Sequence, residues 1–248
     1  MIDIRNLNKR FGKLTVLDDV NLFCEKGECI ALIGPNGCGK TTLIKSILGM
    51  VVPDSGEILF NEKPVRKDYK YREQIGYMPQ IGRYPDNMSI GQIFETIREI
   101  RHYQGETDDE LMQQFGLDRM FDKRMRTLSG GTTQKVSASL AFLFNPEVLI
   151  LDEPTAGLDP LASEILKEKI IAEKEKGKLI LITSHLLSEL DDLITRIIFM
   201  QDGKVQFHLP VEELLSSTSE HRISAAIAKV MRDRAEGATK AIYNSAEK

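Results

Sequence analysis

One glycine-rich run, together with the segments on either side of it, constrains the fold of this chain most. The segment Glu28 to Ile33 is short and apolar, and the run GPNGCGKT, from Gly34 to Thr41, follows it directly. Thr42 to Leu48 then has a helical pattern, with Gly49 as its stop signal. A strand, a glycine loop and a helix in this order are the context in which G-x-x-x-x-G-K-[ST] binds nucleotide phosphates. The run alone predicts nucleotide binding, a property that many unrelated proteins share.

The residue types in this run suit a phosphate ligand. Successive glycines let backbone N–H groups point at phosphate oxygens, and the N-terminus of the following helix adds its dipole. Lys40 supplies a cation at the β- and γ-phosphates, and the Thr41 hydroxyl is a ligand for Mg²⁺. Cys38 is either a small filler or a thiol whose modification would block nucleotide binding. The predicted nucleotide contacts in this region are Asn36, Gly37, Cys38, Gly39, Lys40, Thr41 and Thr42.

A second run places two acids at the end of an apolar strand. It reads LILDE, from Leu149 to Glu153. Asp152 is suited to hold Mg²⁺ through its water shell. Glu153 extends one residue further, where it could polarise a water molecule as a general base. Two solvated acids at a strand end are the alternative, which the preceding phosphate loop makes less favoured.

The order of apolar and helical segments predicts an α/β protein. Apolar strands that alternate with helices indicate a mostly parallel sheet covered on both faces. The stretch from about 85 to 145 has helical spacing and almost no strand pattern, so we expect a helical subdomain inserted there. We expect one domain over 1–215 and a helical tail over 216–248. The expected helices are 42–48, 90–101 with Ser89 as its cap, 108–115, 136–144, 161–176, a short helix after His185 and one amphipathic helix in the tail; the expected strands lie within 1–27 and at 28–33, 56–60, 74–78, 148–152, 178–183, 196–200 and 205–207.

Charge and composition exclude several classes of function. The formal net charge is −4 at pH 7, so no nucleic-acid partner is expected. No apolar run approaches the ~18 residues needed to cross a bilayer. The N-terminal residues lack the pattern of a signal peptide, which predicts a cytosolic protein. The three cysteines, Cys24, Cys29 and Cys38, show no C-x-x-C spacing, so neither a disulfide framework nor a zinc site is expected.

The run LSGG, from Leu128 to Gly131, narrows the family. It precedes a helical pattern and the acidic strand. With these runs in this order, the chain resembles the nucleotide-binding subunit of an ATP-binding-cassette (ABC) transporter from Met1 to roughly Leu215. The resemblance implies the ABC ATPase fold, a P-loop NTPase with an N-terminal antiparallel β subdomain. It also implies that Ser129, Gly130 and Gly131 cap the γ-phosphate of ATP from an opposing subunit.

The same resemblance assigns roles to other positions. Phe11 matches the aromatic residue that stacks on adenine, and Val16 is assigned to the nucleotide with it. Gln80 matches the glutamine that senses Mg²⁺ and the attacking water. Asp159 matches the loop that crosses the dimer seam, and His185 matches the histidine that contacts the γ-phosphate and positions the water. The implied catalytic residues are Glu153, His185 and Gln80, and the implied metal residues are Thr41, Gln80 and Asp152.

Two departures refine the resemblance. Thr132 follows the LSGG run, where family members often carry Gln or Met. The segment 122–127 lacks the acidic, glycine-containing stretch of one large group of exporters, and it looks more like the ABC-2 group, whose membrane subunits are separate chains. The run from Tyr77 to Pro85 is similar to ATPases of the copper-site maturation transporter for nitrous-oxide reductase. That similarity would make a copper or sulfur species the cargo.

The resemblance implies two partners. The first is a second copy of the chain, joined head to tail by ATP, and the second is an integral membrane permease at the cytoplasmic face of the inner membrane. We expect the permease to dock near Gln80, with Ile81, Arg83 and Tyr84 at the edge of the cleft. One alternative is a soluble ABC ATPase of the repair or translation type, although no long coiled-coil insertion and no second cassette are visible. Another alternative is a binding module without chemistry.

Overall fold

Two β-sheets form the frame of the molecule, and the computed structural model describes residues 1–184 and 193–235. The smaller sheet has four antiparallel strands in the order β2-β1-β4-β5. Its strands are β1 (Ile2–Phe11), β2 (Leu14–Cys24), β4 (Ser55–Phe60) and β5 (Lys63–Pro64). This sheet is built from the N-terminal sixty or so residues, as the strand pattern predicted.

The larger sheet has six strands in the order β10-β9-β3-β8-β7-β6. Neighbours from β9 to β6 are parallel, and β10 pairs antiparallel with β9 at the edge. Every residue of β3, β7 and β8 is buried, as expected when helices cover both faces of a parallel sheet. The strands are β3 (Cys29–Ile33), β6 (Ile75–Met78), β7 (Val148–Asp152), β8 (Leu179–Thr183), β9 (Arg196–Gln201) and β10 (Lys204–Pro210).

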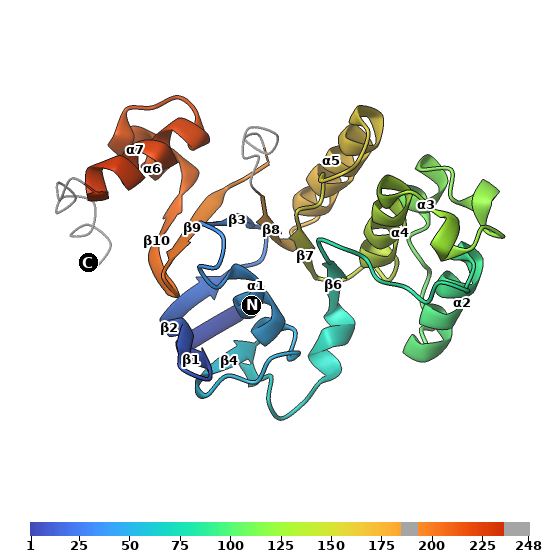
Figure 1. The fold of residues 1–248 in the computed structure, drawn as a ribbon, viewed down its shortest axis with the longest axis horizontal. Coiled ribbons are helices and arrows are strands. Elements are labelled where there is room, and N and C mark those ends of the chain that lie inside the picture. The colour runs from blue at the N-terminus through green and yellow to red at the C-terminus, as the bar shows by residue number, and fades with distance from the viewer. Residues whose placement is uncertain (185–192, 236–248) are drawn as a thin grey trace.

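Helices follow the strands in the order that the pattern predicted (Figure 1). The helices α2, α3 and α4 lie together beyond β6, at the edge of the larger sheet. The α-helices are α1 (Lys40–Ile47), α2 (Ile90–Arg101), α3 (Glu110–Gln114), α4 (Gly130–Phe142), α5 (Pro160–Glu175), α6 (Val211–Thr218) and α7 (Ile223–Ala235). Short 3₁₀ helices are η1 (Lys70–Gln74), η2 (Asp118–Met120) and η3 (Met125–Thr127).

Three apolar clusters hold these layers together. The first lies between the two sheets and includes Leu43, Ile44 and Ile47 of α1. The second covers the other face of the larger sheet with side chains from α4, α5, α6 and α7. The third is confined to the segment from Ile90 to Phe144, between β6 and β7. This segment therefore has an apolar core of its own, which supports the view that it is an inserted unit.

Some boundaries differ from those expected. α2 begins at Ile90 as predicted, because Ser89 forms a capping box with Gln92. α4 begins at Gly130 rather than near 136, because Ser129 caps it. The region near the tail contains two helices rather than one, and α6 crosses the expected boundary at residue 215. The short helix expected after His185 lies outside the described residues.

No helix in the described ranges has both the length and the apolar character that a membrane span requires.

Candidate functional site

The loop between β3 and α1 has a backbone that only glycine accommodates at two positions. Gly34 has φ of +151°, and a Cβ there would lie 2.1 Å from the backbone oxygen of Met200. Gly39 has φ of +110°, and its Cβ would lie 2.6 Å from the backbone oxygen of Val16. Real Cβ atoms do not approach other atoms this closely, so the loop can lie against Met200 of β9 and Val16 of β2 only if these two residues are glycines. The loop is thereby fixed at the N-terminus of α1.

Lys40 is the first residue of α1 and closes the loop from within. Its Nζ donates to the backbone oxygens of Gly34, at 2.7 Å, and of Pro35, at 3.1 Å. The ammonium group therefore lies above the start of α1, where the helix dipole also favours an anion. The backbone N–H of Cys38 is taken up by the oxygen of Pro35, and the Cys38 side chain is buried.

A cleft of about 730 Å³ opens beside this loop. It gathers residues from the glycine loop, from the hairpin between β1 and β2, from the segment after β6 and from the end of β7. Its lining residues are Phe11, Leu14, Val16, Asn36, Gly37, Gly39, Lys40, Thr41, Thr42, Gln80, Asp152 and Glu153. All predicted residues of the phosphate loop except Cys38 line it; the Cys38 side chain is buried, with its Sγ 4.0 Å from Lys40 Nζ.

Leu14 was not predicted, although it lines the cleft and is 66% exposed. It faces Phe11 in register across the turn that joins β1 to β2. Two exposed apolar side chains on either side of one hairpin turn are the signal that would have found it, because exposed apolar side chains that adjoin one another often mark a binding surface.

The two acids at the end of β7 lie in different local environments. Asp152 is buried and pairs in register with Thr183 of β8, whose hydroxyl donates to its carboxylate. Glu153 has φ of +53°, a conformation that non-glycine residues rarely adopt. Its backbone N–H is held at 3.1 Å from both the backbone oxygen and the hydroxyl of Thr183. Thr183 therefore orients both acids. Burial raises the pKa of the neighbouring Tyr77 to about 12, and the charge of Asp152 adds to the rise.

The residues of this cleft fit a magnesium nucleotide. Within the described residues, no group of three or more His, Cys, Asp or Glu side chains is placed to enclose a metal ion. Mg²⁺ does not need such a cage, because it usually keeps several waters and binds one or two protein oxygens together with substrate phosphates. The Asp152 carboxylate, the Thr41 hydroxyl and the Gln80 amide are oxygen donors of that kind, and all three line one cleft. The exposed rings and methyl groups of Phe11 and Leu14 offer a flat apolar surface for a base.

Ser129, Gly130 and Gly131 lie apart from this cleft, at the N-terminus of α4. Ser129 Oγ accepts the Thr132 N–H at 3.2 Å, and the hydroxyls of the two residues lie 2.9 Å apart. Ser129 and Gly130 are exposed. Thr132 thus supports the Ser129 hydroxyl directly, so this departure from the family pattern preserves the geometry of the helix start.

Asp159 also lies outside the cleft, and α4 holds it in place. Its carboxylate caps α5 by accepting the Ala162 N–H at 2.9 Å, and it accepts from Lys135 Nζ at 2.7 Å. The bond from Lys135 lowers the pKa of the Asp159 carboxyl. One residue earlier on α4, Gln134 Nε2 lies 3.5 Å from the backbone oxygen of Glu153. α4 therefore contacts both the acid in the cleft and the exposed Asp159. His185 lies outside the described residues.

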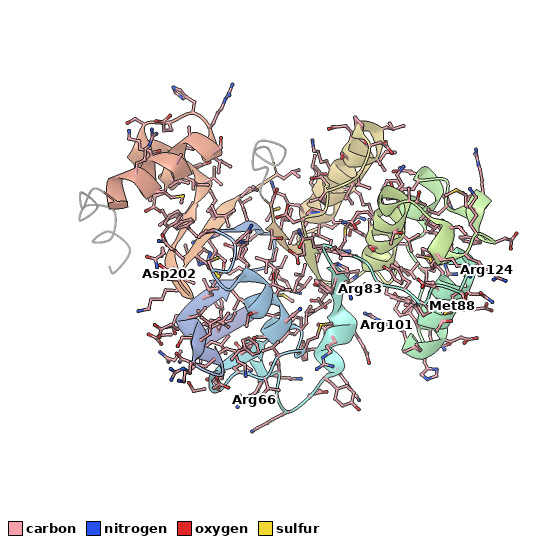
Figure 2. The ribbon with its side chains drawn as sticks, in the orientation of Figure 1. Arg66, Arg83, Met88, Arg101, Arg124 and Asp202 are labelled. Atoms are coloured by element: carbon pink, nitrogen blue, oxygen red, sulfur yellow. The ribbon has the colours of Figure 1, made fainter. Side chains whose placement is uncertain are left out.

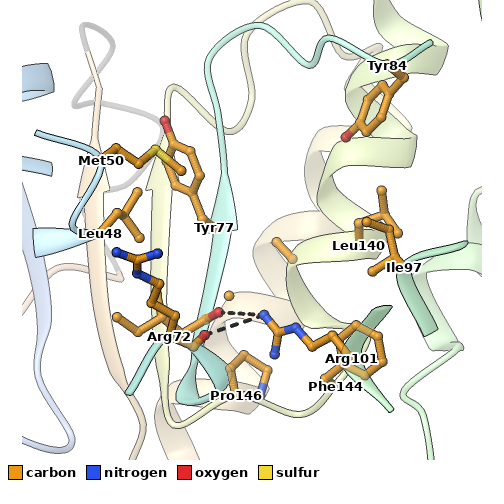
Figure 3. Close-up of a pocket in the computed structure, with 13 residues that line it drawn as sticks. Leu48, Met50, Arg72, Tyr77, Tyr84, Ile97, Arg101, Leu140, Phe144 and Pro146 are labelled. Atoms are coloured by element: carbon orange, nitrogen blue, oxygen red, sulfur yellow. Dashed lines mark hydrogen bonds between the residues drawn. The ribbon is translucent and has the colours of Figure 1, made fainter. Parts of the chain in front are cut away.

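A groove of about 310 Å³ separates the larger sheet from the inserted helices (Figure 3). Tyr77 and Met50 face it from the sheet side, and Ile97 and Leu140 face it from the helices. At one end Arg101 donates to the backbone oxygens of Arg72, Glu73 and Ile75. The full lining is Leu48, Met50, Arg72, Ile75, Gly76, Tyr77, Tyr84, Ile97, Arg101, Leu140, Ala141, Phe144 and Pro146.

The segment after β6 joins the two hollows. Gln80 lines the cleft, whereas Tyr84, four residues later, lines the groove and lies 2.9 Å from the Ser137 hydroxyl of α4. Ile81 between them is 69% exposed. A displacement of Gln80 in the cleft would therefore be transmitted along four residues of backbone to Tyr84 in the groove.

Comparison with known proteins places the chain among transporter subunits. Residues 17–156 match the family model described as ABC transporter. The Nod factor export ATP-binding protein I of Burkholderia lata is 33% identical over 82% of this chain and 68% of its own length. The lantibiotic transport ATP-binding protein SrtF of Streptococcus pyogenes is 35% identical over 83% of this chain and 89% of its own.

Solved structures share the fold. An ATP-binding subunit of an ABC transporter is 27% identical, with a TM-score of 0.86 over 93% of this chain and 99% of that one. A dimeric ATP-binding cassette bound to ADP and phosphate is 24% identical, with a TM-score of 0.74 over 85% of this chain and 99% of that one. The predicted fold class, with its antiparallel sheet and mostly parallel core sheet, is confirmed.

Proposed function

The chain belongs to the ATP-binding subunits of ABC transporters, and on that premise we propose that it hydrolyses ATP between two head-to-tail copies and so drives a separate membrane subunit. One observation carries the proposal. The cleft holds Lys40, Gln80, Asp152 and Glu153 but nothing from the LSGG run, whose Ser129 and Gly130 are exposed at the start of α4. A second copy is the simplest source of the missing half, because a two-fold dimer supplies one patch to the other twice.

The residues of the cleft divide the work of phosphoryl transfer to water. Lys40 and the glycine-loop N–H groups stabilise charge on the transferred phosphoryl group, which is the main contribution in such reactions. Glu153 orients and polarises the attacking water, and Asp152 and Thr41 are the residues that would hold Mg²⁺. Bound Mg²⁺ supplies charge neutralisation at the phosphate oxygens. Loss of the γ-phosphate removes the contacts that join the two copies, so hydrolysis lets them part.

Phosphate release by the purified chain tests the ATPase activity itself. We expect hydrolysis that requires Mg²⁺ and stops when the metal is chelated, because the metal would neutralise charge on the phosphate oxygens during transfer. Equilibrium binding of a fluorescent ATP analogue is measured alongside. Binding without any hydrolysis would instead favour a module that has lost its chemistry.

We propose that the groove in Figure 3 receives the membrane subunit. Its lining is mainly apolar, and Tyr84 connects it through a short segment to Gln80. A soluble ABC ATPase of the repair or translation type would have no membrane subunit to place there. The proposed location is therefore the cytoplasmic face of the inner membrane. The segment from 216 is proposed as a C-terminal helical tail, whose helix α7 packs in the apolar cluster of the larger sheet.

Joint replacement of Arg83 and Tyr84 by alanine tests this docking. We expect loss of co-purification with the membrane subunit and of coupled transport, while ATP hydrolysis by the isolated chain persists, because neither residue lines the cleft. Tyr84→Phe, which keeps the ring and removes only the hydroxyl near Ser137, is the matched control and should retain docking. Intact co-purification and transport in the double variant would refute the docking site.

The transported cargo and the direction of transport are separate proposals. The copper or sulfur cargo suggested by the run from Tyr77 to Pro85 stays a prediction, and the two relatives are named for other cargo, one for Nod factor export and one for lantibiotic transport. Since one of these relatives is named for export, we propose export as the direction. Identification of the membrane protein that co-purifies with the chain would test both points.

A further inference from the structure

A basic segment runs from β5, the last strand of the small sheet, into η1, over residues 63–72. Half of its ten residues are cations, and Asp68 is the acid among them, with Glu62 and Glu73 on either side. The five cations Lys63, Arg66, Lys67, Lys70 and Arg72 are all exposed. The chain as a whole has a net charge of −4, so this segment concentrates positive charge against the general balance.

The lysines of this segment are available to a partner. Within the described ranges, Lys63, Lys67 and Lys70 form no side-chain hydrogen bond or ion pair, since the ion pairs of the described residues all involve other groups. The two arginines have a different role. Arg66 donates to the backbone oxygen of Pro53, and Arg72 donates to that of Gly49 at 3.2 Å. The two arginines are therefore held by backbone oxygens, whereas the ammonium groups of the three lysines remain available to a ligand.

Apolar side chains lie among these cations. Tyr69 is 73% exposed, Val52 is 66% exposed and Met50 is 63% exposed. A hollow of about 470 Å³ is lined by Val52 and Tyr69 together with Arg66, Lys67 and Arg72, among others. Exposed aromatic and aliphatic groups set among lysines are typical of a surface that enters the headgroup region of a bilayer.

This surface is continuous with the docking groove. Arg72 lines both the 310 Å³ groove and the 470 Å³ hollow. Met50 lines the groove and is followed in the chain by Val51 and Val52, which line the hollow. In Figure 2, Arg66 lies at the lower edge of the view, below the small sheet, and Arg83 and Arg101 lie higher, toward the inserted helices. A membrane subunit seated in the groove would bring its surrounding bilayer close to this segment.

We propose that the basic segment 63–72, with Tyr69, Val52 and Met50, binds the anionic surface of the bilayer that holds the membrane subunit. This inference rests on the proposed function, because that function brings the chain to a membrane. Each lysine near an anionic surface strengthens binding several-fold, and the apolar groups add contact with the headgroup layer. A nucleic acid would match the charge but would give no reason for exposed Val52 and Met50 beside it.

Flotation of the purified full chain with vesicles tests this proposal. The vesicles are phosphatidylcholine alone or phosphatidylcholine with phosphatidylglycerol. We expect binding to the second kind that weakens as salt rises, because exposed charges are screened. The triple variant Lys63→Gln, Lys67→Gln, Lys70→Gln should bind about a hundredfold more weakly, because three several-fold losses multiply. The control variant Lys26→Gln, Lys204→Gln, Arg222→Gln removes the same charge from exposed sites elsewhere and should float like the unchanged chain.

The outcomes separate this proposal from the proposed function. ATP hydrolysis, measured on the same samples, should be equal in all three proteins, since none of the six residues lines the cleft. Equal flotation of the two triple variants would overturn the role of the basic segment, whether or not ATP is hydrolysed. Binding to both kinds of vesicle alike, or to a polynucleotide but to neither vesicle, would also overturn it. Selective flotation without any hydrolysis would support the surface and count against the proposed function.

Discussion

The Glu153→Gln variant is expected to hydrolyse ATP ~10²–10⁴-fold more slowly than the unchanged chain, because it removes a general base and keeps the shape of the side chain. The backbone around Glu153 has an unusual conformation, with φ of +53°, that its N–H bonds to Thr183 maintain. Those bonds involve only backbone atoms of residue 153, so glutamine should preserve them. The effect should therefore fall on the chemical step and not on folding.

The same variant should accumulate as an ATP-bound dimer. If the γ-phosphate joins two copies, then failure to cleave it leaves them joined. Sedimentation with ATP and with ADP measures this directly, beside steady-state phosphate release. Glu168→Gln, at an exposed position of α5 away from the cleft, is the matched control and should behave like the unchanged chain. Near-normal turnover in Glu153→Gln would show that another group acts as the base.

The second large effect is expected at Ser129, which lies outside the cleft of its own subunit. Ser129→Asp should abolish most hydrolysis, because a carboxylate at this position would repel the γ-phosphate that the residue is proposed to face. Aspartate and asparagine both cap helices well, so α4 should still begin at Gly130 in either variant. Ser129→Asn is therefore the matched control, with the same size and no charge.

Two measurements on Ser129→Asp distinguish its effect from damage to the nucleotide cleft. ATP binding to the single subunit should be unchanged, because Ser129 does not line the cleft. Phosphate release should fall far below that of Ser129→Asn. Equal activities of the aspartate and asparagine variants would mean that Ser129 does not face phosphate at all.

The sequence predicted those parts of the site that depend on neighbouring residues. The phosphate loop could be predicted because glycine spacing, Lys40 and Thr41 lie within one short run. The start of α2 could be predicted because its cap, Ser89, is local. Leu14 and Thr183 were missed because their roles arise from pairing between strands: Leu14 faces Phe11 across a hairpin, and Thr183 faces Asp152 across parallel strands.

The parts of the fold that the sequence did not predict also depend on contacts that local sequence patterns do not show. The helical pattern of α4 is weak near Gly130 and Gly131, so its true start depends on the cap that Ser129 provides. The amphipathic helix predicted in the tail corresponds to α7, whereas α6 (Val211–Thr218) was not predicted and ends at Ser219, with φ of +55°. The groove beside Tyr84 could be placed near Gln80 from resemblance, but its lining from α2, α4 and the larger sheet depends on the tertiary fold.

The central claim is that each active site takes Lys40 from one copy and Ser129 from another. A mixing experiment with Lys40→Ala and Ser129→Asp subunits tests it most directly. Each variant alone should be inactive, since both of its sites lack one half. A mixed dimer would contain one site with both halves intact, so an equal mixture should recover up to about a quarter of the unchanged activity by counting of subunits in a two-fold dimer. A mixture as inactive as its two components would contradict the claim, because it would place both residues in the site of a single chain.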